Sequence, residues 1–529
     1  MASPRSSPPV PLSGQGAEIG NLFVQADASF STCDAVPLFV LASGSRVSRA
    51  DFLAQTDQIA GALADAGVRP GDRVMLQAGK SIPGVAVYLA TLKIGAVFNP
   101  LNTAYTAPEV AYFLADAEPK VVIAPAAKMS GLAGGVRALL TLEADGSGSL
   151  IEAARQAKPF GPAVPRTADD LAALVYTSGT TGRSKGAMIT HGNLLSNARA
   201  LIDLWELRPG EALIHALPVY HVHGLFVAMN TALLGGLKMH WLEKFDVGHV
   251  LGLLAQSQVM MGVPTFYTRL LRERGLDRAA CGSMRLFISG SAPLLTETHT
   301  QFHERTGHPI LERYGMTETG MIASNPCQGT RVAGSVGYGL PGVSVRVADD
   351  FGRELPRGST GMVEVRGPNV FKGYWRMPEK TREEFRADGY FITGDQGVMA
   401  EDGRLALVGR AKDLIITGGL NVYPIEIEQA LNAIPGISES AVIGVPHQDF
   451  GEGVVAVVTV TDNQPIDETA IIASLAERLA KFKCPKRVIV VAELPRNAMG
   501  KVTKAELRAT FKDLFNGGYP ANTEARIPT

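Results

Sequence analysis

Short runs of strand-forming residues alternate with helix-like stretches through the first half of this chain. The clearest strand-like runs are residues 72–77, 120–125, 171–177 and 284–289. Segments 88–95 and 268–275 are helix-like. Such alternation is typical of strands joined by crossover helices, so we expect an α/β fold with largely parallel strands. At 529 residues the chain is too long for one core and should form two or more domains.

The residue pattern changes after Gly334, where short strand-like segments are separated by frequent glycine and proline. Segments 361–367 and 403–409 are examples. This pattern predicts a small β subdomain after the α/β layers, and we expect it to be a β-barrel.

A glycine-rich segment over 409–424 comes before an amphipathic helix that should begin near Pro424. Strand-like runs follow at 439–445 and 454–460, which indicates a small α+β domain. We therefore place a domain boundary at residue 411. The predicted divisions are a disordered tail over 1–20, an N-terminal domain over 21–411 and a C-terminal domain over 412–529.

The charge balance excludes several classes of partner. Fifty Lys and Arg residues against 51 Asp and Glu leave a formal net charge of -1, so no overall field would attract nucleic acid or an anionic membrane. The four cysteines form no CxxC pair, which argues against a disulfide framework or a zinc site. No apolar run reaches the roughly 18 to 20 residues that span a bilayer. We expect a cytoplasmic protein that acts on small molecules; the first 20 residues leave an organelle-targeting signal open.

Residues Tyr176 to Gly186 have the sequence YTSGTTGRSKG and directly follow an apolar strand-like run. Glycine lets the backbone turn its N–H groups toward an anion, hydroxyl groups add donors, and Lys185 adds positive charge, so the loop suits a polyphosphate. It differs from the P-loop pattern GxxxxGK[ST], because Lys185 follows Ser184 and precedes Gly186. The predicted nucleotide-binding residues of this loop are Thr177, Ser178, Gly179, Thr180, Thr181, Gly182 and Lys185.

This loop resembles the AMP-binding signature of the adenylate-forming superfamily, which includes acyl-CoA synthetases, luciferases and peptide-synthetase adenylation domains. Further motifs of that superfamily follow in its order, and the resemblance covers the chain from about residue 25 to residue 510. It implies a large N-terminal domain and a small, mobile C-terminal domain. It also implies an ATP-dependent acyl-CoA synthetase that forms an acyl-adenylate, with Mg²⁺ as cofactor and coenzyme A as second substrate.

The segment ERYGMTET, residues 312–319, is the next of these motifs. In the superfamily the residue matching Tyr314 lies against adenine, and those matching Thr317 and Glu318 serve the phosphates and magnesium. The chemistry is consistent, because a flat ring stacks on a base and a carboxylate shares Mg²⁺ with phosphate oxygens. The resemblance makes Glu318 a catalytic residue and the metal ligand, and it adds Gly315 and Ser291 to the ATP-binding set.

Three further positions follow from the resemblance. Asp395 in YFITGDQG matches the aspartate that accepts hydrogen bonds from the ribose hydroxyls, and Arg410 matches the arginine that assists it. Lys412 matches the hinge of the C-terminal domain. Gly418 and Gly419 match the glycines at the coenzyme A tunnel, where a side chain would block the thiol.

Lys501 in LPRNAMGKV matches the lysine that enters the active site for adenylation. Since the reaction gathers negative charge around the α-phosphate, an ammonium group there would stabilise it. We therefore predict that Lys501 is catalytic. The surrounding PRNAMGK also resembles the acetylation sequence of acyl-CoA synthetases, so a lysine acetyltransferase and deacetylase are predicted partners.

The acid is predicted from segments around 213–226, 244–250, 261–271 and 284–294, which resemble malonyl-CoA synthetases. A malonate pocket must neutralise the carboxylate that does not react, because an unpaired buried charge costs several kcal/mol. Arg269 is the expected partner, since a guanidinium group meets a carboxylate bidentately. His221 is expected to flank the substrate as a catalytic residue, while His223 fits either the pocket or the core. The other predicted acyl-pocket residues are Ser289, Gly290, Met316 and Met321.

Several alternatives stay open. Gly320 to Ala323 depart from the malonate pattern, which leaves methylmalonate or a short monocarboxylic acid possible. A carrier-protein-loading enzyme, a luciferase-like oxygenase and a non-catalytic nucleotide-binding regulator share the fold, but the regulator would be expected to lose Lys501. His299 and His303 have a spacing that can bind zinc, but HExxH would need histidine where Gly307 stands, and we expect a solvated helix face.

Overall fold

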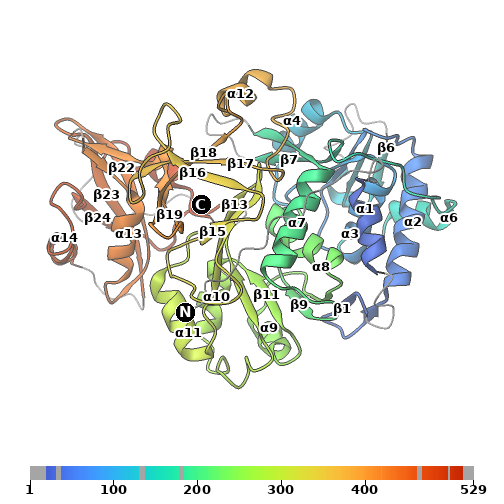
Figure 1. Cartoon of the computed structure of the whole chain (residues 1–529), viewed down its shortest axis with the longest axis horizontal. Coiled ribbons are helices and arrows are strands. Elements are labelled where there is room, and N and C mark those ends of the chain that lie inside the picture. Colours follow the sequence, from blue (N-terminus) through green and yellow to red (C-terminus); the bar gives the residue numbers. More distant parts are fainter. Residues whose placement is uncertain are drawn as a thin grey trace, which may run out of the picture.

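The structure is a computed structural model, and it describes residues 20–30, 37–129, 138–177, 184–418, 420–461, 467–497 and 501–515. Two large sheets, a small antiparallel sheet and a C-terminal sheet make up the described strands. Figure 1 shows the C-terminal elements at one end of the molecule, beside the small sheet, and the helices of the first 150 residues at the other. The α/β class and the division into a large N-terminal and a small C-terminal part are as predicted.

The first large sheet has the order β6-β5-β3-β4-β7-β8 and is parallel except for β8 at its edge. The predicted runs at 72–77, 120–125 and 171–177 are its strands β3, β5 and β7, with the first two one residue shorter at each end. The strands are β3 (Arg73–Leu76), β4 (Val97–Pro100), β5 (Val121–Ala124), β6 (Ala138–Thr141), β7 (Leu171–Thr177) and β8 (Lys185–Thr190).

The second large sheet has the order β15-β14-β13-β12-β11-β9-β10-β1-β2. Its centre, from β13 to β1, is parallel, and antiparallel strands close both edges. The strands are β1 (Phe39–Leu41), β2 (Arg46–Val47), β9 (Ala212–His215), β10 (Lys238–Trp241), β11 (Val259–Gly262), β12 (Leu286–Ser289), β13 (Leu311–Met316), β14 (Gly320–Ser324) and β15 (Tyr338–Gly339).

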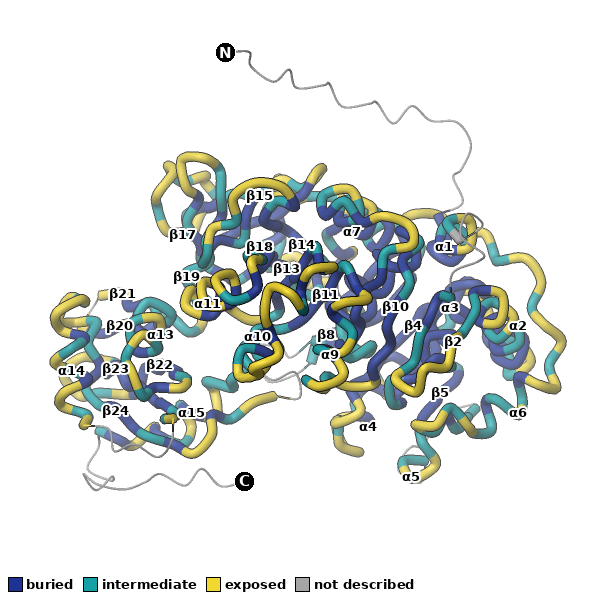
Figure 2. The backbone as a smooth tube through the Cα atoms, turned by 90° about the horizontal axis from the view of Figure 1, so that it is seen from below, coloured by how far each residue is buried: buried dark blue, intermediate teal, exposed yellow. Residues whose placement is uncertain are grey.

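Helices between the two large sheets join them into one core. Helix α3 (Ile82–Lys93) is buried at every residue but Pro83, which fits a helix that is apolar on all sides. Its side chains share one apolar cluster with strands of both sheets. Figure 2 shows β4 and β10, one from each sheet, as buried. Helices α1 (Leu22–Phe30) and α2 (Arg49–Asp65) contact α3, and α7 (His191–Leu204) and α8 (Asn230–Leu234) contact α1.

Further helices complete the N-terminal domain. One of them, η1 (His223–Met229), is a π-helix that runs directly into α8. The others are α4 (Ala107–Ala117), α5 (Ala126–Met129), α6 (Ser149–Gln156), α9 (Val247–Leu254), α10 (Pro264–Leu271), α11 (Thr296–Thr306) and α12 (Pro378–Glu383). No helix among the described residues is both long and apolar enough to cross a membrane.

The expectation of a solvated histidine face on α11 is wrong for one of the two residues. His299 is buried with Phe302 and Thr306, at the spacing of one helix face, whereas His303 is exposed. Burial lowers the pKa of His299. His299 is therefore a core residue of this helix.

The predicted small β subdomain is an antiparallel sheet in sequence order. Its strands are β16 (Ser344–Ala348), β17 (Thr360–Arg366), β18 (Phe391–Met399) and β19 (Leu405–Arg410). The last pair brings Asp395 directly opposite Arg410. This register places two predicted nucleotide residues side by side.

The C-terminal sheet has helices on both faces. Alternation along β22 sends Val442 toward α13 and α14, and Ala441 and Ile443 toward α15. After η2 (Ala411–Asp413), the elements are β20 (Ile415–Thr417), β21 (Leu420–Val422), α13 (Pro424–Asn432), β22 (Ile437–His447), β23 (Gly451–Val460), α14 (Glu468–Ala476), β24 (Arg487–Val490) and α15 (Lys504–Phe511). Helix α13 begins at the predicted Pro424. The boundary at residue 411 stays a prediction.

Candidate active site

The predicted phosphate loop connects the paired ends of β7 and β8. Thr177 ends β7 and Lys185 begins β8, and the two residues are partners in the antiparallel ladder. The ladder therefore fixes where the loop leaves the sheet and where it returns. Outside the described residues lie Ser178, Gly179, Thr180, Thr181 and Gly182, whose contacts with phosphate stay a prediction.

Lys185 is buried and is held by two residues that the sequence did not suggest. Its Nζ lies 2.8 Å from Glu384 Oε1 and 4.1 Å from the centroid of the Tyr374 ring. The Tyr374 hydroxyl lies 2.6 Å from Glu384 Oε2 and 3.1 Å from Glu318 Oε1. Glu384 is 199 residues from Lys185 in sequence, so no local pattern could have paired them.

Glu318 lies in the turn between β13 and β14 and is only 5% exposed. The hydroxyl of Thr177 donates to its Oε1 at 3.4 Å, so the carboxylate faces the start of the phosphate loop. Burial raises the pKa of Glu318, which means that its charge lacks full compensation from the protein. A hard carboxylate oxygen at this position has the chemistry that Mg²⁺ prefers.

The predicted adenine and ribose residues are in contact with one another. The hydroxyl of Tyr314 donates to Asp395 Oδ2 at 2.5 Å, and Arg410 Nε lies 2.7 Å from Asp395 Oδ1. Burial raises the pKa of Asp395, and the charge of Arg410 opposes that effect. Tyr314 is 7% exposed. The carboxylate is thus held in place by both of its predicted neighbours.

Lys501 reaches this cluster from the C-terminal domain. The pKa of Lys501 is lowered to about 8, mainly by burial and also by the charge of Arg410. The charges of Asp395 and Glu318 raise the pKa and so oppose this effect. These are the charges of the nucleotide site, so the ammonium group lies among them. The backbone N–H of Lys501 donates to Asn497 Oδ1 at 3.1 Å, which holds the segment that carries it.

Arg313 is a buried cation that the sequence analysis overlooked. It is 4% exposed, and burial lowers the pKa of its guanidinium to about 9. Neither Nε nor Nη2 has a hydrogen-bond partner among the described residues. A sequence signal was present, because Arg313 stands within the buried strand β13, where a charged residue needs a partner.

Other unpartnered polar atoms surround Arg313. Ser289 Oγ and His223 Nε2 are buried and have no partner in the described part of the chain. A Cβ atom on Gly290 would lie 2.4 Å from Arg313 Cζ, so the guanidinium packs directly on this glycine. Ser291 has a positive φ of 70° and its Oγ lies 3.2 Å from His223 Nδ1. Together these residues form a buried polar cluster that carries the positive charge of Arg313.

His221 is close enough to both Lys501 and Arg313 to be affected by their charges. Burial, with the charges of Lys501 and Arg313, lowers the pKa of His221 to about 3, so its ring is neutral at physiological pH. His223, which is 2% exposed, is also kept neutral by burial and by Arg313. A neutral imidazole can donate one hydrogen bond and accept another without repelling the nearby cations.

The acid-binding role of Arg269 stays a prediction, and its surroundings do not favour it. Arg269 is exposed, and no hydrogen bond or ion pair of its side chain occurs in the described structure. On α10 the inward positions are Tyr267 and Leu270, which lie one turn apart. Arg269 falls outside that face, so it lacks the burial on which a strong ion pair with a carboxylate depends.

The remaining predicted residues belong to the acyl pocket, the hinge and the coenzyme A site. Met321 is buried beside Met316, and its backbone N–H and C=O are both bonded to Asn197, at 3.0 and 2.8 Å. Lys412 is exposed in η2, between the β19 and β20 strands, where its hinge role stays a prediction. Gly418 has a positive φ of 57°. Gly419 lies outside the described residues, so the coenzyme A site is likewise a prediction.

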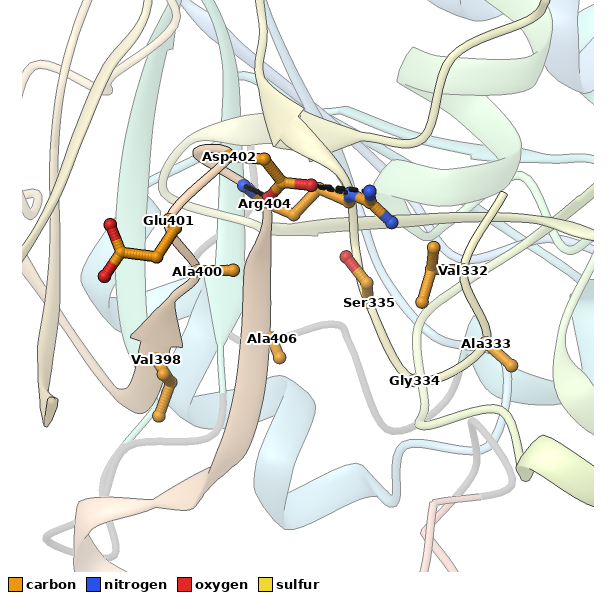
Figure 3. A pocket seen from close by; sticks show the side chains of 10 residues that line it. All are labelled: Val332, Ala333, Gly334, Ser335, Val398, Ala400, Glu401, Asp402, Arg404 and Ala406. Carbon is orange, nitrogen blue, oxygen red and sulfur yellow. Dashed lines mark hydrogen bonds and ion pairs between the residues drawn. The ribbon is translucent and has the colours of Figure 1, made fainter. Parts of the chain in front are cut away.

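A separate surface pocket contains none of these residues. It has a volume of about 530 Å³ and lies between residues 332–335 and the β18–β19 hairpin. Figure 3 shows its lining, in which Arg404 Nε donates to Asp402 Oδ2 at 2.7 Å. The chemistry therefore belongs to the charged cluster described above and not to this pocket.

Comparison with known proteins agrees with this geometry. Residues 27–375 match the AMP-binding enzyme family, and residues 426–501 match the AMP-binding enzyme C-terminal domain. The chain is 35% identical over 480 residues to a malonate–CoA ligase of Arabidopsis thaliana, covering 84% of this chain and 78% of that protein. It is 37% identical over 481 residues to a feruloyl-CoA synthase of an Amycolatopsis species, covering 88% and 94%.

A solved structure is similar over nearly the whole chain. The crystal structure of ATP-bound MatB from Rhodopseudomonas palustris has a TM-score of 0.90 and 53% sequence identity, covering 94% of this chain and 99% of that one. The family match alone spans well over half of the sequence. The chain therefore belongs to the AMP-binding enzyme family of the adenylate-forming superfamily, and it is an acyl-CoA ligase.

Proposed function

We propose that this acyl-CoA ligase makes malonyl-CoA from malonate, ATP and coenzyme A. In the first step a malonate carboxylate oxygen attacks the α-phosphorus of ATP, and pyrophosphate leaves. In the second step the thiol of coenzyme A attacks the acyl carbon of malonyl-AMP, AMP leaves with the bridging oxygen, and the thiol proton goes to solvent. The similarity to a malonate–CoA ligase and to MatB supports this choice of acid.

The observation that carries the proposal is the buried guanidinium of Arg313, whose Nε and Nη2 have no hydrogen-bond partner in the described part of the chain. A buried charge without a partner costs several kcal/mol, and a carboxylate that enters the pocket would remove that cost. Ser289 and the neutral His223 could donate further hydrogen bonds to the same carboxylate. A feruloyl or fatty acyl chain would instead leave the guanidinium uncompensated.

Residues of the nucleotide site would each serve the first step. Lys501, as an ammonium group, would stabilise the negative charge that develops around the α-phosphate. Asp395 would accept hydrogen bonds from the ribose, and Tyr314 would lie against adenine. Glu318 and Thr177 would hold Mg²⁺, which when bound neutralises phosphate charge. Lys185 would exchange its contact with Glu384 for a phosphate oxygen.

The choice between malonate and methylmalonate depends on space beside the acyl carbon. Met316 and Met321 contribute flexible, apolar side chains near the β13–β14 turn, and methionine adapts readily to one extra methyl group. We therefore propose malonate as the main acid and methylmalonate as a slower one. A pocket of this kind discriminates a methyl group by about 10- to 200-fold at most.

A panel of acids tests the proposal on the wild-type enzyme. AMP release should be measured with ATP, coenzyme A and either malonate, methylmalonate, succinate, propionate or ferulate. We expect malonate to have the highest kcat/KM, and propionate, which lacks the second charge, to be lower by at least about 30-fold. A higher kcat/KM for propionate or ferulate would refute the malonate assignment while leaving the acyl-CoA ligase in place.

A further inference from the structure

Lys80, in the segment between β3 and α3, has an ammonium group that meets three acceptors. Its Nζ lies 2.8 Å from His215 Nδ1, 2.8 Å from the carbonyl oxygen of His215 and 2.7 Å from that of Leu242. It also lies 4.1 Å from the centroid of the Trp241 ring. His215 is the last residue of β9, and Leu242 directly follows β10. Lys80 therefore connects the first large sheet to the second.

The protons on His215 follow from its partners. Nε2 lies 2.9 Å from the carbonyl oxygen of Gly224, which can only accept, so Nε2 carries the proton. Nδ1 is then the acceptor of a neutral ring. Burial and the charge of Lys80 hold the pKa of His215 well below its usual value, which keeps the ring neutral.

The charge state of Lys80 follows from its hydrogen-bond partners in the same way. Burial lowers the pKa of Lys80, and Glu243 opposes that effect. All three neighbours of Nζ are acceptors, and only the ammonium form has an N–H for each of them. The geometry therefore favours a charged Lys80 that donates to His215, which in turn donates to Gly224.

Gly224 connects this chain of hydrogen bonds to the acyl pocket. It belongs to the first turn of the π-helix η1, next to His223, and π-helical turns often occur at functional sites. The turn is tightly packed, because a Cβ atom on Gly224 would lie 2.0 Å from the carbonyl oxygen of Pro218. The N–H of Leu225 donates to the carbonyl of His221 at 2.9 Å. A shift of Gly224 would thus move both pocket histidines.

We propose that Lys80 and His215 are positioning residues for the acyl pocket. Neither touches the acid; they fix the first turn of η1 and so the placement of His221 and His223 relative to Arg313. The inference rests on one part of the proposed function, namely that the acid binds beside Arg313, His221 and His223. It does not depend on which acid that is.

The test compares two buried lysines. Lys80→Met removes the ammonium group and keeps a linear side chain that is one atom shorter. Lys93→Met is the matched control, because Lys93 is 6% exposed, pairs with Asp57 and lies over the Phe23 ring at the far end of α3. We expect Lys80→Met to lower kcat/KM for the acid in pyrophosphate exchange by about 10- to 100-fold, as small misplacements of a site do. Its apparent KM for ATP should change by less than about twofold.

The control should keep kcat/KM for the acid within about twofold of wild type, even where thermal unfolding shows that it is less stable. The assay uses the acid that the wild-type enzyme activates best, so an error in the acid assignment appears before any variant is measured. An unchanged kcat/KM in Lys80→Met, or an equal loss in both lysine variants, would overturn the proposal.

A double-mutant cycle tests whether Lys80 acts through His215. His215→Phe keeps the ring beside Trp241, whose centroid is 4.9 Å away, but removes both nitrogens. The double variant should lose no more than about twofold beyond the larger single loss, whereas multiplied losses would contradict the relay. His215→Gln, which can restore a donor toward Gly224, should be more active than His215→Phe. If Lys80→Met does not fold, His215→Phe decides, since an unchanged kcat/KM there overturns the proposal.

Discussion

Arg313 and Arg269 show how little a sequence says about which of two arginines is buried. Arg269 stands in segment 261–271, which the sequence marks as part of the acyl pocket, whereas Arg313 stands in the 312–319 motif, which it assigns to the nucleotide and magnesium. On α10, however, Tyr267 and Leu270 take the buried face and leave Arg269 exposed, while β13 carries Arg313 into the core. The direction of a helix face depends on long-range packing, so the sequence could not predict which of the two arginines is buried.

Replacement of Arg313 should therefore remove the preference for a second carboxylate. Arg313→Met should lower kcat/KM for malonate by about 30-fold to a few thousand-fold, the usual cost of truncating one partner of a buried charge pair. Propionate should lose little, and the apparent KM for ATP should stay near that of wild type. Arg269→Ala is the comparison, and we expect it to stay within about threefold, as for an exposed charge. The reverse ranking of the two variants would return the role to Arg269.

The pKa of Lys501, about 8, predicts a pH dependence for adenylation. The ammonium form is present below that pH and is lost as the pH rises through it, so kcat/KM for pyrophosphate exchange should fall on the basic side near pH 8. Lys501→Arg should move this limb above the measurable range, because guanidinium keeps its proton. If the wild-type limb stays unchanged in Lys501→Arg, another group controls it.

At the scale of elements, Gly290 directly after β12 leaves room for the guanidinium of Arg313, because glycine has no side chain. Gly290→Ala would put a Cβ atom 2.4 Å from Arg313 Cζ and displace the guanidinium. We expect the KM for malonate to rise by about 10- to 100-fold with little change for ATP. Gly252→Ala on α9, where an added Cβ meets nothing within 4 Å, serves as the control. A normal malonate KM in Gly290→Ala would show that Arg313 does not hold the acid.

Elements with strong local patterns were predicted well. Strand β7 matches its predicted range, and α13 begins at Pro424, a residue that favours the first turn of a helix. The π-helix η1 was not predicted, because HGLFVAM carries no local signal that separates a π-turn from an α-helix. The sheet orders could not be predicted either, since they depend on pairings between strands that are far apart in sequence.

At the scale of the whole molecule, the candidate active site joins residues from both domains. Lys501 of the C-terminal domain lies among Arg313, Asp395 and Glu318 of the N-terminal domain. The motifs predicted Lys501, Asp395 and Glu318 one by one but not Arg313, and only the fold shows that the four residues meet. It also adds Glu384 and Tyr374, which no motif suggested.

The two half-reactions should depend on different parts of the C-terminal domain. Lys501→Ala should abolish pyrophosphate exchange but leave thioester formation from supplied malonyl-AMP largely intact, because its charge serves the first step. Gly419→Leu, at the predicted coenzyme A tunnel, should have the opposite effect. Equal loss of both half-reactions in each variant would argue against a C-terminal domain that alternates between two orientations about Lys412.

The central claim is that malonate is activated as an adenylate, and the fate of its oxygen atoms tests this most directly. The enzyme should be given malonate labelled with ¹⁸O in its carboxylates, together with ATP and coenzyme A, and the products separated by mass spectrometry. Because the attacking oxygen stays with phosphorus when the thiol displaces AMP, we expect one ¹⁸O atom in AMP and none in pyrophosphate. Label in inorganic phosphate together with ADP, or unlabelled AMP alongside malonyl-CoA, would contradict the account.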